Sequence, residues 1–160
     1  MSRSSEAGGA AQAPTESVLL ILELAGQLYG LPLGSVDEVL RMVAIVALPQ
    51  GPEWIVGTVN ARGRVLPVVD LRARLGFPVH PYGLNTPIVV VTAAGRSAAL
   101  VADRVIETLI APAESHPLGD EFSTAGGVVT GILPLGASLV TILDPEPLCP
   151  WPNGPASEAQ

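Results

Sequence analysis

Three aspartates are the residues in this sequence whose type could support catalysis. Asp70, Asp103 and Asp144 each follow an apolar run of the kind that forms a strand. If the fold brought these carboxylates together at one edge of a sheet, they could serve acid–base chemistry or bind a hard metal ion, as in a small carboxylate-dependent hydrolase. That alternative requires the three to lie within about 10 Å in one pocket. An aspartate just past a strand more often caps the next turn, and we favour that interpretation.

Other catalytic signatures are missing. His80 and His116 each adjoin a proline, far apart in the sequence, so we interpret both as surface histidines. All eight basic residues are arginines, which excludes a Walker-type phosphate loop and a Schiff-base lysine. Cys149 is the only cysteine, so no intrachain disulfide or cysteine-rich zinc site can form. We therefore expect no enzyme activity, no cofactor and no metal.

Charge and cysteine content limit the partners and the compartment. The formal net charge is −7 and the arginines form no basic run, so binding to nucleic acid is not expected. A single cysteine fits a reducing, cytoplasmic location. We expect no secretory signal in residues 1–16, which lack an apolar centre.

Length and composition indicate one all-β unit that positions these residues. The 160 residues are 48% hydrophobic and only 14% charged, with 17 glycines and 16 prolines, which favours many short strands joined by turns. This length suits one domain or two small sub-barrels that share a core. We expect a flexible tail at 1–16, the folded domain at 17–148 and a proline-rich tail at 149–160.

The apolar runs predict nine or ten strands and a few helical turns. The predicted strands cover residues 18–24, 28–32, 43–48, 58–61, 65–69, 88–92, 98–102, 105–110, 128–133 and 139–143. We expect helical turns at 36–40 with Ser35 as N-cap, at 54–57, and at 71–75 closed by Gly76. One alternative is a membrane-inserted protein through residues 122–143, which carry no formal charge. The glycines and Pro134 within that segment favour two buried strands instead.

The densest pattern lies between residues 36 and 76 and resembles the CheW-like adaptor family of bacterial chemosensory systems. The resemblance rests on Val36-x-Glu38-Val39-Leu40, Leu48-Pro49 and Gly57-x-Val59-Asn60-x-Arg62-Gly63-x-Val65-x-Pro67-Val68-Val69-Asp70-Leu71-x-x-x-Leu75-Gly76. Later matches, including Val101-Ala102-Asp103 and Ile142-Leu143-Asp144, extend it over about residues 17–148.

The resemblance implies two five-stranded SH3-like barrels around a shared hydrophobic core, and no catalytic activity. It also implies a cytoplasmic scaffold that couples chemoreceptors to a CheA-type histidine kinase. By match to the family, the receptor-binding residues would be Val36, Glu38, Gly57, Asn60 and Arg62. The kinase-binding residues would be Arg41, Ile45 and Pro49.

Each receptor-side residue also has a purely structural interpretation. Gly57 either admits a closely approaching helix or allows a turn. Val36 either offers apolar area or belongs to the core. Glu38 and Arg62 either recognise a partner or form a surface ion pair worth less than about 1 kcal/mol. Asn60 either contacts a partner or fixes a turn through the backbone.

The sequence departs from the family pattern at three places. Ala61 replaces a bulky aliphatic residue, Ala99 replaces a glycine, and residues 146–148 lack the usual basic residue near the last strand. These departures leave open a second hypothesis within the family: an accessory adaptor that binds receptors but not the kinase, and so caps or remodels an array.

Overall fold

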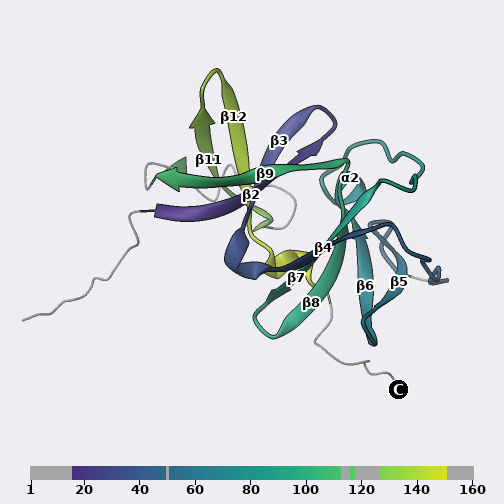
Figure 1. Cartoon of the computed structure of the whole chain (residues 1–160). Helices are drawn as coiled ribbons and strands as arrows, with labels where there is room; N and C mark the ends of the chain where they lie inside the picture. The colour runs from purple at the N-terminus through teal and green to yellow at the C-terminus, as the bar shows by residue number, and fades with distance from the viewer. Residues whose placement is uncertain (1–15, 50, 113–115, 118–126, 151–160) are drawn as a thin grey trace, which may run out of the picture.

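The computed structural model describes residues 16–49, 51–112, 116–117 and 127–150, which form two β-sheets (Figure 1). The first sheet has the strand order β10-β11-β12-β3-β2-β9. Its strands are β2 (Glu16–Leu24), β3 (Gln27–Pro32), β9 (Arg104–Pro112), β10 (His116–Pro117), β11 (Val129–Leu135) and β12 (Ser138–Leu143). Both ends of the described chain thus contribute to one sheet.

The central part of the chain forms the second sheet, with the order β4-β7-β8-β6-β5. Its strands are β4 (Val36–Arg41), β5 (Ile55–Ala61), β6 (Arg64–Asp70), β7 (Pro87–Ala93) and β8 (Arg96–Val101). Three short helical turns complete the described structure: Leu33–Ser35, α2 (Leu71–Arg74) and Glu146–Leu148. The predicted all-β fold with two small sub-barrels is confirmed, with β10 as a two-residue edge strand beyond the five strands expected in the first sheet.

Strands with two buried faces explain the nearly continuous apolar runs in the sequence. Along β2, Leu19 and Ile21 pack inside the first sub-barrel, whereas Leu20 and Leu22 pack in a cluster shared by both sheets. The β7 strand alternates in the same way between the shared cluster and the interior of the second sub-barrel. Since successive side chains of a strand point to opposite faces, every position on such a strand must be apolar.

Two predicted helical turns are wrong. Residues 36–40 form β4, which pairs antiparallel with β7 from Val36 opposite Val91 onward, and the short helical turn precedes it at Leu33–Ser35. Residues 55–57 begin β5, which pairs with β6 from Ile55 opposite Val69. In residues 36–40, pairing with the distant strand β7 outweighs the local helical signal, and in residues 55–57 pairing with the hairpin partner β6 does so.

The predicted strand at 43–48 is also wrong in extent. In that segment, only Val46 makes a β-bridge, with Thr58 of β5. The two residues exchange both backbone hydrogen bonds, each with an N···O distance of 2.8 Å. The segment is therefore held at one point, not along its length.

The helical turn predicted at 71–75 is confirmed as α2. Asp70 is its N-cap, and Asp70 Oδ1 accepts a hydrogen bond from the backbone N–H of Ala73 at 3.2 Å. Gly76 follows with a φ of +89°, the left-handed conformation that commonly ends a helix at glycine.

At the C-terminal end, the chain packs into the shared core as far as Cys149. Leu148 is 0% exposed and Cys149 is 1% exposed. Burial raises the pKa of the Cys149 thiol to about 11, so the thiol is protonated at neutral pH. Residues 1–15 and 151–160, most of the two predicted tails, lie outside the described residues.

Residues 129–143, within the segment weighed as a membrane span, form the β11–β12 hairpin. Within the described ranges, the structure contains no helix of the length and apolar character needed to cross a membrane. Residues 122–126 of that segment lie outside the described part of the chain.

A partly buried ion pair joins the two sheets. The guanidinium of Arg72, on α2, donates to both carboxylate oxygens of Asp103, at 2.7 Å from Nε and 2.6 Å from Nη2. Asp103 Oδ2 also accepts the backbone N–H of Ala25, in the β2–β3 turn, at 2.9 Å. These bonds, those to Arg72 first, lower the pKa of the Asp103 carboxyl below its usual value.

We predict that Asp103→Asn lowers the free energy of unfolding by about 2 kcal/mol at neutral pH, the scale of a hydrogen bond to a charged group. A carboxyl with a lowered pKa stabilises the fold above its unfolded pKa of about 4, and this contribution disappears as the pH falls through the folded pKa. The difference in the free energy of unfolding between wild type and variant should therefore be largest above about pH 5 and decrease as the pH falls below that value. Denaturant unfolding at several pH values measures this difference.

The control is Glu23→Gln, whose partner Arg104 is 67% exposed, so that the pair contributes less than about 1 kcal/mol. An equal, pH-independent loss in both variants would contradict this role of Asp103.

Candidate functional site

The five residues predicted to bind a receptor lie on the two edge strands of the second sheet, β4 and β5, and in the turn that follows β5. Val36 and Glu38 lie on β4, Gly57 and Asn60 on β5, and Arg62 in the β5–β6 turn. Because β4 and β5 are opposite edge strands, the sheet must curl to bring them together. Arg62 Nε lies 2.8 Å from Glu38 Oε1, so one ion pair spans the two edges.

Position 57 must be glycine because residues 45–46 of the same chain pack directly against its backbone. A Cβ atom at this position would lie 2.3 Å from the carbonyl oxygen of Val46 and 2.7 Å from Cγ2 of Ile45. Separations this short do not occur in folded proteins, so any side chain here displaces residues 45–46. Gly57 lies within β5 and not in a turn, and the segment that approaches it belongs to this chain.

Asn60 fixes the turn that carries Arg62. Its Oδ1 accepts a hydrogen bond from the backbone N–H of Gly63 at 2.8 Å. Arg62 and Gly63 both have positive φ angles, +56° and +83°, as tight hairpin turns require. The structural interpretation of Asn60 therefore holds, and its effect is to aim Arg62 outward.

The ion pair between Glu38 and Arg62 orients the arginine more than it stabilises the fold. The Arg62 side chain is 77% exposed and that of Glu38 is 23% exposed. An exposed pair of this kind contributes at most about 1 kcal/mol. The remaining N–H groups of the guanidinium face solvent, where they can donate to a partner's carboxylates or carbonyls.

Val36 combines the two roles considered for it. Its side chain is half-buried and packs against the shared core, opposite Val91 of β7. Val39 on the same strand is 45% exposed, and its apolar surface was not singled out from the sequence. In a strand over residues 36–41, Val39 shares a face with the charged Asp37 and Arg41, and this position is the signal that could have identified it.

The three residues predicted to bind the kinase follow directly in the chain. Arg41 ends β4 and is exposed, Ile45 is half-buried against the interior of the second sub-barrel, and Pro49 is exposed. Val46, between them, is 66% exposed. Since residues 45–46 lie against Gly57, the two predicted contact sets adjoin each other on one sub-barrel.

The three aspartates have structural partners. Asp70 caps α2 and accepts a hydrogen bond from the Tyr82 hydroxyl, and Asp103 pairs with Arg72. Asp144 Oδ1 accepts the backbone N–H of Glu146 at 3.0 Å. Asp70 and Asp103 line the same cavity, but Asp144 is not among its lining residues. Among the described residues, no three His, Cys, Asp or Glu side chains are grouped to hold a metal ion.

Comparison with known proteins agrees with this geometry. The profile of the CheW-like domain matches residues 18–152, most of the chain. This chain belongs to the CheW-like family. It is 29% identical over 131 residues to the chemotaxis protein CheW of Klebsiella aerogenes, covering 81% of this chain and 79% of that protein. It is 27% identical over 141 residues to CheW of Helicobacter pylori, covering 86% of each.

A solved structure supports the same assignment. The crystal structure of the scaffolding protein TtCheW from Thermoanaerobacter tengcongensis superimposes with a TM-score of 0.72 and 30% sequence identity, covering 80% of this chain and 88% of that one. The SH3-like sub-barrels are therefore those of a CheW-like protein, and the chain is a non-enzymatic chemotaxis scaffold. The predicted family, the fold and the expectation of no enzyme activity are confirmed.

We predict that Gly57→Ala destabilises the protein by about 1–3 kcal/mol, the usual result of overpacking, because the new methyl group displaces the backbone of Val46. Amide hydrogen exchange of Val46 and Thr58 should accelerate together, since each bonds to the other.

The matched control is Gly34→Ala, where a Cβ would meet nothing within 4 Å and φ is not in the left-handed region. Equal stability of the two variants would show that the contact with Val46 does not constrain the fold.

Proposed function

We propose that this protein is a cytoplasmic scaffold that couples chemoreceptors to a CheA-type histidine kinase. The observation that carries the proposal is the outward-facing Arg62, held by Asn60 and Glu38 at the closed edge of the second sub-barrel. This arrangement occurs in a chain whose family and fold are those of CheW. Membership of the family supports the cytoplasmic location.

Receptor binding, the first part of the proposal, is supported by the presence of both a cation and apolar side chains at this edge. A receptor tip is a helical hairpin, which offers carboxylates, carbonyl groups and apolar side chains. Arg62 offers free N–H donors beside Val36 and Val39, which supply apolar area. Gly57 contributes indirectly, because its missing side chain lets the edge close.

The kinase arm of the proposal uses the neighbouring segment. The regulatory domain of a CheA-type kinase is itself CheW-like by family, and we infer that it meets this sub-barrel side to side. Arg41 and Pro49 are exposed, and Val43 and Val46 are 39% and 66% exposed, which gives the segment an apolar surface with one cation.

The receptor-only alternative rests on the departures from the family pattern. Two of them lie inside the second sub-barrel, where Ala61 is 6% exposed and Ala99 is 0% exposed, so they alter its packing and not its surface. Only the third adds a surface change, since Glu146 is exposed. We therefore favour the two-partner scaffold over an adaptor that has lost its kinase face.

Calorimetric titration of the full chain with a receptor tip and, separately, with a kinase regulatory domain tests both arms. We expect binding in both titrations. Binding to the receptor alone selects the accessory adaptor, and binding to neither overturns the proposal.

We predict that Arg62→Glu weakens receptor binding at least about tenfold, the equivalent of 1.4 kcal/mol, because it replaces the free donors by a charge that repels carboxylates. The double variant Glu38→Arg with Arg62→Glu restores the internal ion pair with its polarity reversed. It should recover thermal stability but not receptor affinity, as measured by unfolding and calorimetry. Recovery of affinity in the double variant would show that the pair acts only within the fold.

A further inference from the structure

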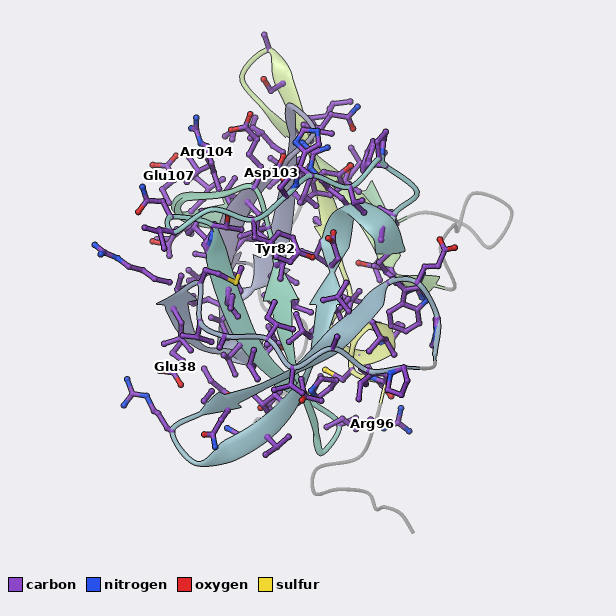
Figure 2. All side chains as sticks on the ribbon, turned by 90° about the vertical axis from the view of Figure 1, so that its right-hand side faces the viewer. Glu38, Tyr82, Arg96, Asp103, Arg104 and Glu107 are labelled. Carbon is purple, nitrogen blue, oxygen red and sulfur yellow. The ribbon has the colours of Figure 1, made fainter. Side chains whose placement is uncertain are left out.

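The end of the second sub-barrel that carries Arg62 is held together across its edges by side chains. Within the described residues, the sheet is hydrogen-bonded in the order β4-β7-β8-β6-β5, so the edge strands β4 and β5 are not paired with each other. The bridge between Val46 and Thr58 ties β5 only to the segment after β4. Near the β5–β6 turn, the edges are joined through Arg62 and Glu38. This end lies in the lower half of Figure 2, where Glu38 and Arg96 are labelled.

A ring of four polar side chains lies beside that ion pair. Four different strands each contribute one member: Asp37 from β4, Thr92 from β7, Ser97 from β8 and Arg64 from β6. Thr92 Oγ1 lies 2.6 Å from Asp37 Oδ2 and 2.7 Å from Ser97 Oγ. Arg64 Nη2 donates to Ser97 Oγ at 2.6 Å. Arg64 Nη1 lies 3.7 Å from Asp37 Oδ2, which closes the ring.

Two local features of the strands bring the ring together. The register of β4 with β7 shifts between Val36 and Glu38, so Asp37 is the extra residue of a β-bulge. A bulge re-aims a side chain, and here the carboxylate of Asp37 reaches the hydroxyl of Thr92. In the β7–β8 hairpin, Thr92 lies directly opposite Ser97, which keeps the two hydroxyl groups side by side.

The direction of each hydrogen bond in the ring follows from the donors present. Thr92 has one hydroxyl proton and donates it to Asp37. The proton between the two hydroxyl groups therefore comes from Ser97, which accepts in turn from Arg64. The chain runs from a cation through two hydroxyl groups to a carboxylate, so each bond polarises the next. Ser97 is 1% exposed, and its hydroxyl depends on these two partners.

The ring adjoins both members of the ion pair in the sequence. Glu38 directly follows Asp37, and Arg64 comes two residues after Arg62. A shift of β4 relative to the start of β6 would therefore break the ring and separate the ion pair together. The family pattern that selects Arg62 leaves position 64 open.

We propose that Thr92 and Ser97 are positioning residues for Arg62. Their hydroxyl groups connect Asp37 to Arg64 and so fix β4 against the β5–β6 hairpin, which keeps Glu38 within reach of Arg62. An arginine that is already oriented loses less conformational entropy when a partner binds. The effect on affinity rests on the receptor binding proposed above, whereas the effect on Arg62 in the free protein does not.

The test is an NMR measurement on the full, ¹⁵N-labelled chain without a partner. The heteronuclear NOE at Arg62 Nε reports how well the side chain is ordered. Glu38→Gln supplies the reference value for Arg62 without its ion pair. Ser97→Ala and Thr92→Val should each lower the NOE toward that reference, and Thr92→Ser, which keeps the hydroxyl group, should retain the wild-type value.

The matched control is Thr130→Val, because the Thr130 hydroxyl donates to the carbonyl of Ile142 in the first sheet, at 3.3 Å. It should leave the NOE at Arg62 unchanged. Ser97→Ala introduces no larger side chain, so it keeps the test valid if Thr92→Val does not fold. A wild-type NOE in Ser97→Ala, or an equal loss in Thr92→Ser and Thr92→Val, would overturn the proposal.

Calorimetric titration with a receptor tip supplies the second readout. Ser97→Ala and Thr92→Val should weaken binding about two- to tenfold, the range expected for ordering one long side chain on binding. Thr92→Ser and Thr130→Val should bind as wild type does. Unchanged affinity in the first two variants would contradict a positioning role in binding. Absence of binding by the wild type would overturn the proposed function, while the NOE measurement would still decide the role of the ring.

Discussion

The contact between Gly57 and the backbone of Val46 is the constraint on which the second sub-barrel depends. The Val46 carbonyl occupies the place where a side chain at position 57 would lie, and this approach allows Val46 and Thr58 to bond. A short segment after β4 is thereby fixed against β5, and the two edges of the sheet meet. Arg62 can then reach Glu38 across the closure. The proposed contact surface is therefore a consequence of one missing side chain.

The two sub-barrels act as a unit because they share a core and an ion pair. Each sheet supplies one face of its strands to the common cluster, which also buries Leu148 and Cys149. At the surface of this junction, Arg72 and Asp103 connect α2, the β8–β9 connection and the β2–β3 turn. In the scaffold function that we propose, this rigidity would fix how two bound partners lie relative to each other.

Much of the fold was predictable from the sequence, because strands buried on both faces require unbroken apolar runs. The cap at Asp70 and the glycine at 76 marked α2 in the same local way. The segments 36–40 and 54–57 were mispredicted, since β4 exists through pairing with β7, far along the chain, and the start of β5 through pairing with the far end of its hairpin partner β6.

In the candidate site as well, local sequence predicts some features, whereas others depend on contacts between segments that are separated in the chain. The family pattern selected Gly57 and Arg62, but the reason for Gly57 lies eleven residues away in the chain, at Val46, and no local pattern encodes that approach. The cavity beside Asp70 had no sequence signal either. Its walls come from β2, α2, the loop 76–86 and the start of β9, and the pairings of β6 with β8 and of β2 with β9 bring these segments together.

Co-sedimentation of the kinase with receptor-bearing membranes tests the central claim, that this protein couples two partners, most directly. Membranes that carry a chemoreceptor are mixed with a CheA-type kinase, with and without this protein, and the kinase in the pellet is quantified. The scaffold account predicts that the kinase sediments in proportion to the protein added, up to saturation of the receptor. A pellet that contains this protein but no additional kinase would contradict it.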